Sequence, residues 1–132
     1  MTARNVFFGT IIILGCTVLP VALMLGYDAY HSRDITAKII ARAPERGNFA
    51  PREVTVVAGE KARIQIRNND TVTHGFASPL LGVDADMIKA GHVVVVEFTP
   101  EKPGTYDFYC TTWCSEFHLQ MRGKIIVVAK TP

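Results

Sequence analysis

The sequence has few cysteines, and they do not form a disulfide framework. Its 132 residues include three cysteines, an odd number. Cys16 lies inside an apolar run, which leaves only Cys110 and Cys114 close to each other. A small fold held together by several disulfides is therefore not expected.

The chain also lacks an excess of charge of one sign. The formal net charge is +2. From Pro44 onward, ten Lys and Arg residues are matched by ten Asp and Glu residues. No basic patch typical of a nucleic-acid binder is present, so no nucleic-acid partner is expected. Any docking face for a protein partner is expected to be apolar rather than strongly charged.

One long stretch, Val6 to Tyr27, has no charged residue. As a helix, its roughly 22 residues at about 1.5 Å each would cross the hydrocarbon core of a membrane. Residues 1–27 are therefore predicted to be an uncleaved membrane anchor. A cleaved signal peptide is one alternative. A lipoprotein processed at Cys16 is another, because Ile13–Cys16 loosely resembles a cleavage box.

Residues 28–47 alternate apolar and charged side chains and are predicted to be a stalk or linker that continues the helix. Pro44, Gly47 and Pro51 then mark a boundary. From 48 to 132 the pattern is typical of strands separated by turns, as in the alternation of residues 62–67. The long connection from His74 to Val93 is not predicted to contain a strand. This region is therefore expected to form a mainly β, antiparallel sandwich or barrel.

A cluster of soft metal ligands lies near the C-terminus. Cys110, Cys114, His118 and Met121 occur within twelve residues, and His74 lies upstream. These ligand types suit copper, with zinc as the common competitor. A zinc site would leave Met121 unused, and a structural disulfide would give neither histidine a role. A mononuclear blue-copper site needs one cysteine, whereas two thiolates can bridge two copper ions.

The spacing Cys-x3-Cys-x3-His-x2-Met with an upstream histidine resembles the CuA domain. This domain occurs in subunit II of cytochrome c oxidases, including the short single-helix ba3 type, and at the C-terminus of nitrous oxide reductase. The resemblance covers roughly residues 49–129. It includes the motifs Asp70–Phe76, Lys102–Cys110 and His118–Gly123. It implies a cupredoxin-like Greek-key sandwich or barrel, here preceded by one transmembrane helix.

The resemblance also implies a binuclear site with two copper ions. The implied ligands are two imidazoles, two bridging thiolates, one weak thioether and one backbone carbonyl: His74, His118, Cys110, Cys114, Met121 and Thr112. Trp113, between the two cysteines, is a candidate point for electrons to enter. Its alternative role is to pack over the site.

The implied role is one-electron transfer, without catalysis by the chain itself. The expected donor is cytochrome c or a small copper protein, and the expected acceptor is an integral membrane catalytic subunit of a haem-copper oxidase-type respiratory complex. The chain would then be a single-pass protein of the inner cell membrane, with its C-terminal domain on the periplasmic or outer side of the lipid bilayer. The alternatives are electron transfer for nitric or nitrous oxide reduction and a role as a copper carrier or assembly factor.

Overall fold

The computed structural model describes residues 3–32 and 34–131 as two compact units, Met1–Asp34 and Ile35–Pro132. Within the first unit, α1 runs from Ala3 to Ser32 and contains Pro20. Over the described residues, no helix combines the length and the apolar character needed to cross a membrane. Residues 1 and 2 of the predicted anchor, residue 33 of the predicted stalk and Pro132 lie outside the described residues.

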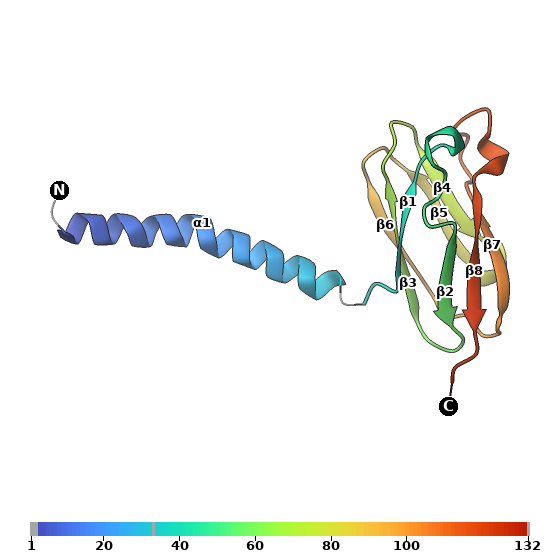
Figure 1. The fold of residues 1–132 in the computed structure, drawn as a ribbon, viewed down its shortest axis with the longest axis horizontal. Coiled ribbons are helices and arrows are strands. Elements are labelled where there is room, and N and C mark those ends of the chain that lie inside the picture. Colours follow the sequence, from blue (N-terminus) through green and yellow to red (C-terminus); the bar gives the residue numbers. More distant parts are fainter. Residues whose placement is uncertain (1–2, 33, 132) are drawn as a thin grey trace. The chain divides into compact units, whose positions relative to one another are not determined.

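The second unit is a β-sandwich of two sheets, shown as two layers in Figure 1. One sheet has the order β1-β3-β6, formed by Ala37–Ala41, Ala62–Asn68 and Val93–Phe98. The other has the order β2-β8-β7-β4-β5, formed by Glu53–Val57, Arg122–Val128, Gly104–Tyr109, His74–Ser78 and Val83–Ile88. Three short 3-10 helices connect strands: η1 (Pro44–Arg46), η2 (Pro79–Leu81) and η3 (His118–Gln120). The prediction of a mainly β sandwich is confirmed.

The prediction for residues 28–47 needs correction. The helix ends at Ser32, and Ala37–Ala41 form β1, which pairs with β3 in parallel. Ile39 is 1% exposed and Ala41 is fully buried. These two side chains lie on the same face of the strand, because every second residue of a strand points the same way. The pairing of β1 adds this stretch to the sandwich.

Two further expectations differ from the structure. The sheets are mixed rather than purely antiparallel, because β2 pairs with β8 in parallel, as β1 does with β3. The connection after His74 contains two strands, β4 and β5, which pair with each other around an irregularity between His74 and Phe76. All five residues of β4 are buried, so this strand lacks the alternation that marks a half-exposed strand.

Three buried phenylalanines form the part of the core next to the candidate site. The ring centroids of Phe76 and Phe108 lie 4.8 Å apart. Phe49 meets both rings edge-on, at 5.7 Å and 5.2 Å. Phe76 follows His74 by two residues, and Phe108 precedes Cys110 by two. The cluster therefore anchors both strands close to the predicted ligands.

Candidate metal centre

The fold brings the two halves of the ligand pattern to one end of the sandwich. β4 begins at His74, and its antiparallel neighbour β7 ends one residue before Cys110. The start of β4 therefore lies beside the end of β7. The N–H of Cys110 donates to the carbonyl oxygen of Met121 at 3.0 Å, which closes the base of the loop that carries the other ligands.

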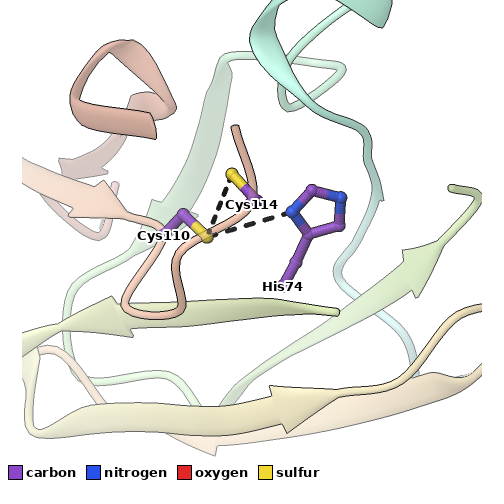
Figure 2. A group of neighbouring side chains, drawn as sticks. All are labelled: His74, Cys110 and Cys114. Carbon is purple, nitrogen blue, oxygen red and sulfur yellow. Dashed lines mark hydrogen bonds between the residues drawn. The ribbon is translucent and has the colours of Figure 1, made fainter. Parts of the chain in front are cut away.

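The donor atoms converge around the two sulfurs. Cys110 Sγ lies 4.0 Å from Cys114 Sγ and 3.9 Å from His74 Nδ1 (Figure 2). Both cysteines are free thiols. The ligand atoms of His74, Cys110 and Cys114 all lie within 4.8 Å of one another. These three side chains can therefore meet one metal region.

The remaining predicted ligands surround the same sulfurs. His118 Nδ1 lies 3.5 Å from Cys114 Sγ, and Met121 Sδ lies 3.6 Å from it. The carbonyl oxygen of Thr112 lies 3.1 Å from Cys110 Sγ. The structure thus brings all six predicted ligand groups together, with one imidazole next to each cysteine sulfur.

The site is closed on one side and open on the other. His74 is fully buried, whereas His118 is partly exposed. Trp113 is 72% exposed, and its ring centroid lies 5.7 Å from that of His118. A cavity of about 350 Å³ reaches Cys110, His118 and Met121. The side that faces solvent is therefore the His118 side.

Burial lowers the pKa of His74, although the carboxylate of Asp70 opposes this effect. A neutral imidazole is the form that binds metals. Burial, together with the nearby Cys110, raises the pKa of the Cys114 thiol to about 12. The Cys114 thiol is therefore protonated at neutral pH in the absence of a metal, and metal binding must release its proton.

Two residues at the site were not predicted from the sequence. The N–H of Gly75 donates to Cys110 Sγ at 3.4 Å. Asp70 Oδ2 lies 3.3 Å from His74 Nε2. Burial alone raises the pKa of Asp70, but hydrogen bonds from Ala43, Thr71, His74 and Arg46 outweigh it and lower the pKa to about 2. Both residues are within the motif around His74, but their roles depend on which atoms the fold places beside the ligands.

The donor chemistry fits copper. Two thiols, two imidazoles and a thioether form a soft set, and the thioether suits copper in particular. The 4.0 Å between the sulfurs is short enough for one ion to touch both at a thiolate bond length of about 2.3 Å. The β-sandwich with its His74, Cys110 and Cys114 group therefore suggests a copper-binding domain.

Comparisons with known proteins agree with this description. The family model of the cupredoxin-like domain matches residues 15–127. Nitrous-oxide reductase from Cupriavidus necator is 34% identical over 102 residues, which are 75% of this chain and 15% of that protein. An alternative cytochrome c oxidase subunit 2 from Bradyrhizobium diazoefficiens is 34% identical over 73 residues, 55% of this chain and 26% of that protein. The chain therefore spans only a small part of these relatives.

Solved structures support the fold alone. Reduced auracyanin from Roseiflexus castenholzii matches with a TM-score of 0.57 at 20% identity, covering 70% of this chain and 95% of that chain. The metal-binding domain of a Cu(I)-exporting ATPase from Streptococcus pneumoniae matches with a TM-score of 0.57 at 19% identity, covering 73% of this chain and 88% of that chain.

Proposed function

The chain belongs to the cupredoxin-like domain family, and from that premise we propose that it transfers single electrons through a binuclear copper centre. The observation that carries this proposal is the arrangement around the sulfurs. His74 lies next to Cys110, and His118 lies next to Cys114. Cys110 and Cys114, with one imidazole beside each of their sulfurs, would provide similar ligands for two copper ions.

The weak ligands extend the same arrangement. The Thr112 carbonyl oxygen lies next to Cys110 Sγ, and Met121 Sδ lies next to Cys114 Sγ. Each cysteine sulfur thus has one imidazole and one weaker donor close by. When bound, the copper pair would supply a one-electron redox couple shared over both ions.

The protein's own contribution is to limit rearrangement. His74 is held by a strand, and the Cys110 loop is closed by its backbone bond to Met121. The Gly75 N–H donates to Cys110 Sγ and stabilises negative charge on that sulfur. Burial keeps water away from the thiolates. Ligands that move little between redox states favour fast electron transfer.

We propose that electrons enter on the His118 side. Trp113 and Leu119 are 72% and 76% exposed, and the Trp113 ring lies beside the His118 ring. An exposed apolar surface of this kind suits a transient redox partner. The proposed donor is cytochrome c or a small copper protein.

The proposed acceptor is the catalytic subunit of a haem-copper oxidase-type complex. The similarity to an alternative cytochrome c oxidase subunit 2 supports this assignment. The similarity to nitrous-oxide reductases supports the alternative, electron delivery for nitrous or nitric oxide reduction. Co-purification with a neighbouring subunit, identified by mass spectrometry, would distinguish the two acceptors.

Attachment to the inner membrane, with the copper domain on its periplasmic side, is also a proposal. Its support is the uncharged run from Val6 to Tyr27. Retention of the chain in membranes after carbonate washing would support it. Digestion of the domain by a protease added to spheroplasts would support the proposed orientation. Complete release of the chain by carbonate would contradict the anchor.

Copper loading of the full chain tests the proposed centre. Electron paramagnetic resonance should show hyperfine structure from two equivalent copper nuclei, and elemental analysis should give two copper ions per chain. A Cys16→Ala variant is the matched control, because its thiol lies outside the site and should leave the spectrum unchanged. A pattern from one copper nucleus would contradict the binuclear proposal.

A copper carrier is the second candidate, and one observation favours it. A cavity of about 350 Å³ is lined by Cys110, His118 and Met121, and His118 is partly exposed, which offers copper a way out on this side. A carrier should release copper to an apo partner within minutes. An electron-transfer centre should retain copper while it is repeatedly oxidised and reduced. The rate of copper loss to a Cu(I) chelator during redox cycling separates these outcomes.

A further inference from the structure

The carboxylate of Asp70 is a buried charge next to the candidate site. Its side chain is 1% exposed. The N–H groups of Ala43 and Thr71 each donate to it at 2.7 Å, and Arg46 Nη1 forms an ion pair with it at 2.5 Å. His74 Nε2 also lies next to it, at 3.3 Å. A buried carboxylate with this many partners stays charged and fixed in place.

The same contact determines which nitrogen of His74 carries a proton. An ionised carboxylate only accepts hydrogen bonds, so the Nε2 next to Asp70 must be the protonated nitrogen. Nδ1 then keeps its lone pair. That nitrogen is the one that faces Cys110 Sγ, at 3.9 Å. The carboxylate thus leaves the correct nitrogen free for a metal.

The second histidine has a different environment. His118 is partly exposed, and its ring lies beside the exposed Trp113. Its contact with Cys114 is also through Nδ1. Among the contacts of the described residues, no carboxylate hydrogen-bonds to His118. The two imidazoles therefore offer a comparison within one molecule, one with a fixed carboxylate and one without.

We propose that Asp70 is a positioning residue, which keeps His74 in its Nε2-protonated form with Nδ1 directed at the metal. Arg46, Ala43 and Thr71 hold the carboxylate in place, which makes the short helix η1 part of the support of the centre. Through the hydrogen bond, the carboxylate also increases the basicity of the imidazole. The effect on reduction potential rests on the proposed copper function, whereas the protonation pattern does not.

The protonation pattern can be measured in the wild-type protein. Nitrogen NMR of histidine-labelled full chain should show His74 protonated at Nε2. Its Nε2 proton should exchange with solvent at least tenfold more slowly than that of His118, because it is buried and bonded. Protonation of His74 at Nδ1, or equal exchange of the two protons, would overturn the proposal. This test needs neither copper nor a variant.

Asp70→Asn tests the link to the metal. Groups of four residues, Ala43, Arg46, Thr71 and His74, meet the two carboxylate oxygens, and an amide can accept on one side only, so the hydrogen bonds cannot all survive. In the copper-loaded variant, the nitrogen coupling of one imidazole should change, and the reduction potential should rise. The rise is expected because a less basic ligand and one fewer negative charge favour the reduced ions. Arg46→Gln should instead lower the potential slightly, because it removes a positive charge while Asp70 keeps its backbone partners.

Glu97→Gln is the matched control. Glu97 also has two ion pairs, with Lys61 and Arg63, but it lies on β6 in the other sheet. It should change neither the coupling nor the potential. A folded, copper-loaded Asp70→Asn protein with the wild-type coupling and potential would overturn the proposal. If that variant does not fold, Arg46→Gln and the wild-type NMR decide. The copper count from the same spectra tests the binuclear proposal separately.

Discussion

The two histidines of the site are placed by different kinds of structure. His74 is the first residue of a fully buried strand, and its Nε2 contacts the carboxylate of Asp70. His118 begins a three-residue helix in a loop, beside an exposed tryptophan and a cavity. The comparison indicates that one half of the centre is part of the sheet, while the other half forms the surface. Precise ligand position and access for a partner are thus provided by separate halves.

The loop between the two cysteines joins these halves. Cys110 is the first residue after β7 and is fixed by the sheet on the His74 side. Cys114 lies next to both ligands that follow it in the loop, His118 and Met121. Replacements on either side should therefore have different consequences.

Cys114→Ser removes one of the two thiolates that are proposed to bridge the copper ions. The binuclear hyperfine pattern should disappear, and copper content should fall to one ion or fewer per chain, because a hydroxyl is a poor bridging ligand for copper. Spectroscopy and elemental analysis of the same sample provide the measurement. The Cys16→Ala protein, treated identically, serves as the reference. Survival of the two-copper pattern would count against the bridging role.

His74→Gly and His118→Gly test the difference between the halves directly. Each variant should lose the native spectrum. Added imidazole should restore it in His118→Gly, because the cavity of about 350 Å³ opens to that position. It should not do so in His74→Gly, where the ring is fully buried. Titration with imidazole, followed by absorption, measures this. Equal rescue of both variants would contradict the comparison.

Gly75→Ala should disturb the buried half through packing. A Cβ at this position would overlap Thr111 Oγ1 and lie 3.1 Å from the Thr111 N and Cβ atoms. We expect a loss of about 1–3 kcal/mol in the free energy of unfolding of the apo protein. Thr111→Ala, added to the first variant, should recover part of the loss. Chemical denaturation of both single variants and the double variant provides the test, and purely additive effects would contradict the steric explanation.

The lowered pKa of Asp70, which contacts His74, makes the free energy of unfolding depend on pH. Because this pKa is lowered from 3.8 to about 2, the charged form stabilises the folded apo protein above pH 4. That contribution is lost as the pH falls through about 2, and it amounts to about 2 kcal/mol. Wild-type stability measured by denaturation between pH 5 and 2 should therefore fall more steeply than that of Asp70→Asn. Parallel curves would contradict this.

Trp113→Ala should have the smallest effect on the centre itself. The copper spectrum should be retained, because the indole is exposed and provides no ligand. Loss of a central aromatic contact costs about 1 kcal/mol or more of binding free energy. Electron transfer from the donor should therefore slow roughly fivefold at subsaturating concentrations. Stopped-flow kinetics measures this, and Leu80→Ala, which removes a similarly exposed apolar residue outside the segment from Cys110 to Met121, is the control.

Much of the site could be predicted from local sequence, and part of the fold could not. The alternation of residues 62–67 correctly predicted a half-buried strand, β3. The strand from His74 to Ser78 was missed because all its side chains are buried, so no alternation marks it. The strand from Ala37 to Ala41 was missed because its partner, β3, lies more than twenty residues away. Local patterns do not show such pairing.

The spacing of Cys110, Cys114, His118 and Met121 is a property of the sequence, because one short loop must bring all four together. The position of His74 beside Cys110, 36 residues apart, was decided by the pairing of β4 with β7. Tertiary structure alone also placed Asp70 next to Nε2 of His74 and left His118 near solvent. The residue types determine which ligand atoms are available, but the orientation and exposure of these ligands depend on which distant strands pack together.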